Sequence, residues 1–172
     1  MGEVGCLKDE HLQNLQAQNS VIKSLGYKLS VVRIAATTLS PTVLQSGTIF
    51  STDALAGCTI SLPSAVAGLV YEFHVGRTPT SGTFQINAAG ADTFQGITDM
   101  APIEGHGVAY ASENHGWACI IGGNNQFATG NSSTKGRLLG THLVFKCLSD
   151  TIWMVTGNQL SAGAVDNPFS SV

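Results

Sequence analysis

The chain has 172 residues, of which 43% are hydrophobic and only 11% are charged, and its formal net charge is -3 at pH 7. This length and hydrophobic content indicate a folded domain and exclude a chain that is disordered throughout. Lysine and arginine form no cluster, which excludes the basic surface of a typical nucleic-acid-binding protein. Ordinary domains are roughly 25% charged. The low fraction of charged residues in this chain has two alternative explanations. The surface is rich in Ser, Thr, Asn and Gly, or it is covered in an assembly.

No apolar stretch has the length needed to span a bilayer, and the first thirty residues lack the apolar segment of a secretory signal. We therefore expect a protein made in the cytoplasm, with no membrane partner. The four cysteines fit no zinc or redox spacing. Cys6, Cys58, Cys119 and Cys147 could in principle form two disulfides. Apolar residues surround Cys58, Cys119 and Cys147, which favours buried free thiols instead.

Residues 1–38 form the first predicted segment, an N-terminal arm. Within it Leu12, Leu15, Ile22 and Leu25 recur at helical spacings, which predicts an amphipathic helix of about four turns. A helix of this length is unstable in isolation, so its apolar stripe needs a surface to cover it. That surface is either the chain's own domain or another molecule. We predict that these four residues make contacts with sister subunits or with a larger partner.

Residues 39–157 form the second segment, in which β-branched and aromatic runs alternate with Gly, Pro, Asn and Ser. In Tyr71–Val75 apolar and polar side chains alternate, as in a strand with one buried face. This pattern predicts an all-β domain, an antiparallel β-sandwich of jelly-roll-like form. The predicted strands are Thr48–Ser51, Cys58–Leu62, Val70–Val75, Thr83–Asn87, Gly107–Ala111, Trp117–Ile121, His142–Cys147 and Ile152–Thr156.

Two further stretches are predicted to be irregular. The polar segment Gly122–Gly136 has no periodicity, which is typical of a long surface loop. Residues 158–172, with Gly163 and Pro168, read as an irregular C-terminal tail.

Sequence motifs for nucleophilic catalysis and phosphate binding are absent. No G-x-S-x-G elbow occurs, and Lys135 precedes Gly136 where a phosphate-binding loop needs the reverse order. Asp92 and Asp99 flank a turn, where acidic side chains usually accept hydrogen bonds from backbone N–H groups. A glycosidase pair is the less favoured alternative for these two carboxylates.

The histidines are scattered along the chain. His106 and His115 lie near Glu104 and Glu113, but the spacing matches no helical or hairpin metal motif, and exposed loop histidines are the preferred interpretation. We therefore expect no catalytic residue, no cofactor and no metal ligand, and a protein that is not an enzyme.

Four stretches together resemble a known module. They are CTISLPSA (58–65), GLVYEF (68–73), INAAGADTFQG (86–96) and TIWMVTG (151–157). The series is similar to a β-sandwich module of bacteriophage structural proteins, in which LPxA, Gxx(Y/F)xF, IxAxGxDxxxG and W-x-V-x-G follow in this order. Such modules occur in capsid decoration (cement) proteins and in tail-fibre or spike subunits. The resemblance covers residues 47–157 and excludes the long polar loop.

The resemblance implies a virion structural protein that decorates and stabilises a phage capsid. As in that family, the chain would form a homotrimer or another closed homo-oligomer on the capsid surface, with the major capsid protein as its partner. Two alternatives remain: a host-recognition module of a tail fibre or spike, and a carbohydrate-binding β-sandwich. The low number of Trp and Tyr residues argues against the last.

Elementary chemistry gives the motif residues structural roles. Pro63 ends a strand because it lacks a backbone donor, while Gly68 and Gly96 supply turn conformations that other residues avoid. Trp153 is expected to be buried where the last strand closes the sheet.

Overall fold

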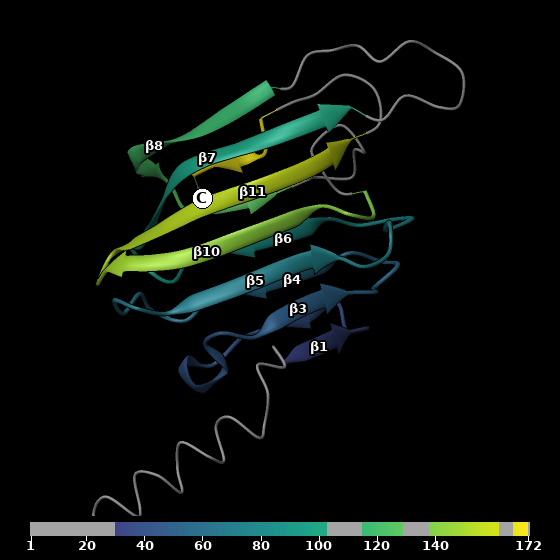
Figure 1. The fold of residues 1–172 in the computed structure, drawn as a ribbon, viewed down its shortest axis with the longest axis horizontal. Helices are drawn as coiled ribbons and strands as arrows, with labels where there is room; N and C mark the ends of the chain where they lie inside the picture. The colour runs from purple at the N-terminus through teal and green to yellow at the C-terminus, as the bar shows by residue number, and fades with distance from the viewer. Residues whose placement is uncertain (1–29, 103–114, 129–137, 162–166, 172) are drawn as a thin grey trace, which may run out of the picture.

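A computed structural model describes residues 30–102, 115–128, 138–161 and 167–171, with the backbone alone described at 100–102 and 115–123. Strands dominate these residues and form two sheets (Figure 1). In spatial order, the seven-stranded sheet contains β1 (Val31–Ile34), β3 (Ile49–Thr52), β5 (Val70–Val75), β10 (His142–Ser149), β11 (Ile152–Ser161), β7 (Thr93–Pro102) and β8 (His115–Asn124). The five-stranded sheet contains β12 (Phe169–Ser170), β9 (Gln126–Ala128), β6 (Phe84–Asn87), β4 (Cys58–Ser61) and β2 (Thr38–Leu39).

The first six strands alternate between the two sheets. Strands β1, β3 and β5 lie side by side and parallel in one sheet, and β2, β4 and β6 do the same in the other. The chain therefore winds through three successive turns of a flattened coil. Strand β10 then pairs antiparallel with β5 and with β11, which extends the larger sheet beyond the coil.

The prediction of an all-β domain is confirmed, but the prediction of antiparallel pairing throughout is wrong, because both sheets contain parallel and antiparallel pairs. The parallel pairs among the described strands are β1–β3, β3–β5, β2–β4, β4–β6 and β7–β11. Alternation along one strand reveals its buried face and carries no information on the direction of the neighbouring strand. The jelly-roll form, which is an antiparallel architecture, is not confirmed.

The sheets extend beyond the predicted β region on both sides. Strand β1 and the first residue of β2 lie in the predicted arm, while the end of β11 and all of β12 lie in the predicted tail. The end of β8 and all of β9 occupy the start of the predicted polar loop. Phe127 and Phe169 explain part of this difference, because their rings meet edge to face at 5.6 Å and are buried. One buried aromatic in a polar stretch gives too little periodicity to predict a strand.

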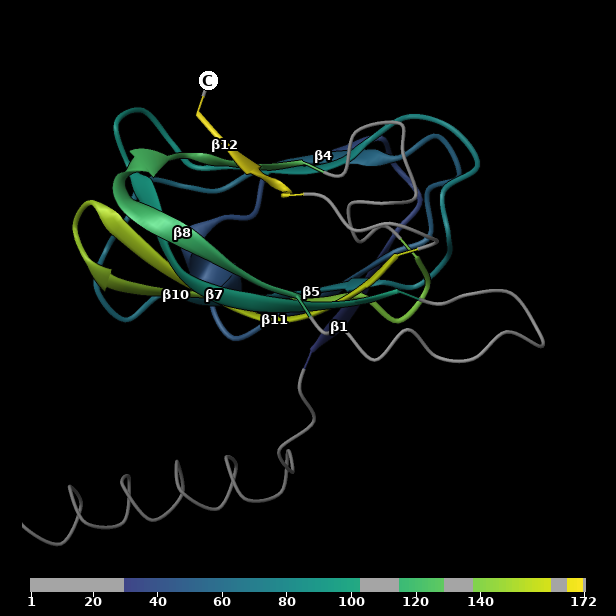
Figure 2. The ribbon, with the colours of Figure 1, turned by 90° about the horizontal axis from the view of Figure 1, so that it is seen from above.

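The hydrophobic core lies between the sheets, which face one another as two layers (Figure 2). Phe73 stacks on Phe50 at 5.5 Å and meets Phe145 edge to face at 5.7 Å. Trp153 is fully buried, as predicted. Its strand, β11, lies between β10 and β7, so Trp153 occupies the interior of the larger sheet and does not close its edge.

The predicted turn residues divide into two groups. Pro63 follows the end of β4 at Ser61, and Gly68 adopts a positive φ of 95° in a turn, both as predicted. Gly96 lies within β7 with a φ of 131°, next to an irregularity in the β7–β8 register, so the prediction of a turn there is wrong. A Cβ at Gly96 would lie 2.0 Å from the carbonyl oxygen of Val155. The glycine is therefore needed for close packing of two strands.

The arm residues Leu12, Leu15, Ile22 and Leu25 lie outside the described residues, as does the strand predicted at Gly107–Ala111. Cys58 and Cys147 are buried free thiols, as predicted. Within the described parts of the chain, no helix has the length and hydropathy to cross a membrane.

Candidate functional site

A cluster of two histidines and one glutamate lies on the outer face of the seven-stranded sheet. In β5 the apolar residues Tyr71, Phe73 and Val75 point into the core, so Glu72 and His74 between them point outward. The same alternation in β10 directs His142 outward. All three side chains therefore project from one face.

The strand register brings these side chains together. His142 lies directly opposite His74 in the antiparallel β5–β10 pair, and Val144 lies opposite Glu72. Side chains at directly opposed positions are close neighbours, and a diagonal neighbour is within reach of a long side chain. Glu72 therefore reaches both imidazoles: the one on its own strand and the diagonal one on β10.

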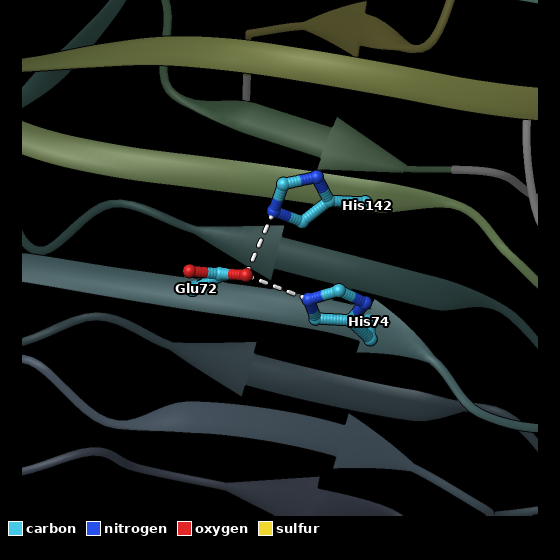
Figure 3. A network of polar contacts seen from close by, with 3 residues as sticks. All are labelled: Glu72, His74 and His142. Carbon is cyan, nitrogen blue, oxygen red and sulfur yellow. Dashed lines mark hydrogen bonds and ion pairs between the residues drawn. The ribbon is translucent and has the colours of Figure 1, made fainter. Parts of the chain in front are cut away.

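The three groups converge on one carboxylate oxygen (Figure 3). Nε2 of His74 lies 2.8 Å from Oε1 of Glu72, and Nε2 of His142 lies 3.0 Å from the same oxygen. The two rings stack, with centroids 4.4 Å apart and planes 23° apart. The side chains keep 29–37% of their surface exposed, so the cluster remains accessible from solvent.

The hydrogen bonding of the two histidines differs. His74 forms a hydrogen bond with Glu72, in which the direction depends on the histidine tautomer. Nε2 of His142 is buried and has no hydrogen-bond partner among the described residues, although Glu72 is near, because the contact lacks hydrogen-bond geometry. The cluster thus offers two imidazole nitrogens and a carboxylate oxygen within 4.8 Å of one another. That donor set is typical of transition-metal sites.

This outer face carries a mostly apolar row beside a polar row, which consists of Arg33, Ser51, His74, His142, Asn158 and Asp99. The mostly apolar row crosses the sheet from β1 to β7 through Val31, Ile49, Glu72, Val144, Thr156 and Ile97. Val31 is 60% exposed and Ile97 is 61% exposed. Apolar residues thus occupy four of the six positions in this row, on the side that faces away from the core.

The outer face of the five-stranded sheet is polar and uncharged. Its outward residues include Thr59, Ser61, Gln85, Asn87, Gln126 and Ser170. Asn87 Oδ1 accepts hydrogen bonds from the side-chain amides of Gln85 at 2.8 Å and Gln126 at 3.2 Å. A shallow pocket of about 360 Å³ lies here, lined by Gln85, Asn87, Ala88, Gly90, Asn125 and Gln126.

The structure joins two of the stretches that carry the phage resemblance. Asp92, in the GADTFQG segment, accepts a 2.7 Å hydrogen bond from the backbone N–H of Ala65, in the LPSA segment. This is the backbone role expected of an acidic residue near a turn. The other motif residues, Pro63, Gly68, Gly96 and Trp153, are spread through the fold and form no common site.

Sequence reasoning missed the Glu72–His74–His142 cluster. The alternation in β5 already puts Glu72 and His74 on one face. His142 joins the cluster only through the β5–β10 register. The two histidines are 68 positions apart in the chain, so no local sequence pattern reveals their contact. His106, Glu104 and Glu113 lie outside the described residues, and the side chain of His115 is likewise not described.

Comparison with known proteins gives no relative from which a function can be transferred. No protein-family model, curated protein or solved structure matches the chain.

Proposed function

We propose that the protein is a structural component of an assembly, a virion protein that binds the surface of a phage capsid as a closed homo-oligomer. The observation that carries the proposal is the mostly apolar row on the outer face of the seven-stranded sheet, which includes the exposed residues Val31 and Ile97. Capsid binding, in place of another assembly, is supported by the sequence resemblance to phage structural modules.

A mostly apolar row on an outer sheet face favours a covering partner on physical grounds. A sheet face that meets water normally carries polar side chains, as the five-stranded sheet does here. The low charged fraction of the chain is consistent with a large covered area.

The N-terminal arm is the occupant that we assign to this face. The described chain begins at Ser30, directly before edge strand β1 of the same sheet. The preceding residues carry the stripe of Leu12, Leu15, Ile22 and Leu25, and each such side chain contributes roughly 1.5–3 kcal/mol when fully buried. We propose that this stripe forms a helix that packs on the face of a sister subunit. Repetition by symmetry then turns modest contacts into tight assembly.

Binding to capsids is tested by imaging and co-sedimentation of purified particles with the full chain and with a variant that lacks residues 1–26. We expect saturable attachment of the full chain at symmetric surface positions, and weak or no attachment of a truncated protein that is still folded. Normal assembly and attachment of the truncated protein would overturn the role of the arm. No attachment of the full chain would overturn the capsid proposal.

The pocket on the five-stranded sheet favours a second function, the binding of a carbohydrate. Side-chain amides of Gln85, Asn87 and Gln126 line an uncharged depression, and such groups donate to and accept from sugar hydroxyls. This alternative applies to a host-recognition module or a cellular lectin. A glycan array distinguishes it: specific binding that is lost in Asn87→Ala supports sugar recognition, and uniform absence of binding removes it.

A further inference from the structure

We propose that Glu72, His74 and His142 bind one divalent transition-metal ion of the zinc class on the outer face of the seven-stranded sheet. The inference depends on the geometry of these three side chains and is independent of the proposed assembly. Its ligands are Nε2 of both histidines and a carboxylate oxygen of Glu72.

The distances suit an ion after a small adjustment. Donor atoms around a tetrahedral ion with bonds of about 2.0–2.1 Å lie roughly 3.3 Å apart. The two Nε2 atoms lie 2.8 and 3.0 Å from Glu72 Oε1, and all three donors fall within 4.8 Å of one another. A shift of the glutamate side chain by about half an ångström opens the space between its oxygen and the two nitrogens, and its partly exposed position permits such a shift.

His142 supplies the observation that a simple hydrogen-bonded cluster leaves unexplained. Its Nε2 points toward Glu72 (Figure 3) and lies in ion-pair contact with Oε1 at 3.0 Å, but it is buried and has no hydrogen-bond partner within the described part of the chain. An unsatisfied buried nitrogen costs free energy. A metal ion between His142 and Glu72 satisfies this nitrogen with a coordinate bond.

The backbone holds the ligands in place before the ion binds. His74 and His142 occupy directly opposed positions on two central strands, and their rings stack at 4.4 Å. Both imidazoles are thus positioned by the sheet, so little side-chain entropy is lost when the ion binds. Arrangement on rigid strands is typical of built sites and unlike the chance proximity of loop histidines.

The donor types select the ion. Imidazole nitrogen suits Zn²⁺, Ni²⁺ and Cu²⁺, whereas Mg²⁺ and Ca²⁺ prefer sites made of oxygen ligands alone. Three protein ligands leave a coordination position for water or for a group from another molecule. The exposed fraction of 29–37% at each side chain gives the ion a path from solvent.

The test is isothermal titration of the full chain with ZnCl₂, repeated with MgCl₂ and with the variants Glu72→Gln, His74→Gln and His142→Gln. The matched control is Asn158→Ala, because Asn158 pairs with His142 on β11 and its side chain is not part of the cluster. Circular dichroism verifies that each variant is folded. The absorption spectrum of bound Co²⁺ gives a second readout, since coordination by nitrogen and oxygen differs from coordination by thiolate.

We expect Zn²⁺ to bind at micromolar or lower concentration and to raise Tm by a few degrees. Each cluster variant should bind at least ~10-fold more weakly, while Asn158→Ala binds as the wild type. The Co²⁺ spectrum should show nitrogen and oxygen ligands and should be lost in His142→Gln. The inference is overturned if folded cluster variants keep the wild-type zinc affinity, or if the full chain binds no more Zn²⁺ than Mg²⁺.

Discussion

The two outer faces of the molecule differ although the same core separates them. The five-stranded sheet presents Thr, Ser, Asn and Gln and has no charged residue in its described strands. The seven-stranded sheet presents exposed Val31 and Ile97 and the Glu72–His74–His142 cluster, together with the charged residues Arg33, Asp99 and Lys146. Both sheets bury apolar inner faces, so folding alone does not require exposed apolar residues on an outer face. We propose that the face with the exposed apolar residues contacts a partner, whereas the outer face of the five-stranded sheet meets water.

The largest loss of stability is expected from a substitution in the hydrophobic core between the two sheets. Phe73 is fully buried and touches the rings of Phe50 and Phe145. Phe73→Ala should lower the free energy of unfolding by about 3–5 kcal/mol, because it removes apolar contact and leaves a cavity. Denaturant unfolding measures the change. Leu148→Ala, at a side chain that is 61% exposed, is the control and should change stability by less than about 0.5 kcal/mol. Similar losses in both variants would contradict the assigned core.

The core and most of its strands could be predicted from the sequence, because alternation of side chains is a local signal. Val70–Val75 has the predicted bounds, and the inward residues of β10 and β11 follow the same rule. Strand direction and register are not local. Parallel pairing of the coil, the pairing of Phe127 with Phe169, and the approach of His142 to Glu72 all join distant segments. These features therefore could not be read from spacing along the chain.

A smaller loss of stability is expected from substitution of a glycine where β11 packs closely on β10. Gly157 in β11 has a φ of 149°, and a Cβ there would lie 2.1 Å from the carbonyl oxygen of His142. Gly157→Ala should cost about 2–3 kcal/mol, since both strain and a backbone clash oppose it. Gly68→Ala also faces a positive φ but has open space, so it should cost only about 1 kcal/mol. Thermal unfolding compares the two, and equal losses would contradict the close β10–β11 packing.

The pH dependence of stability at alkaline pH tests the burial of Cys58 on the inner side of the five-stranded sheet. Burial raises the pKa of Cys58, in β4, to about 11. The folded state thus keeps a proton that an unfolded thiol loses near pH 8.5. This contribution is complete below that pH and is lost as the pH rises toward the folded-state pKa. Stability should therefore fall by about 1 kcal/mol per pH unit above about pH 9, and less steeply in Cys58→Ala. Parallel pH profiles of the two proteins would contradict a buried neutral thiol.

The smallest effect on stability, and the most direct test of the account, comes from placing one charge on each outer face. Ile97→Asp changes the apolar face, and Ser61→Asp adds the same charge at an exposed position of the polar face. Neither should alter the free energy of unfolding by more than about 0.5 kcal/mol. Light scattering at micromolar concentration then measures the mass in solution. We predict a multiple of 17.9 kDa for the wild type and for Ser61→Asp, and a lower mass, toward the single chain, for Ile97→Asp. A wild-type mass of 17.9 kDa, or an undiminished assembly of Ile97→Asp, would contradict the assignment of the seven-stranded face as the contact surface.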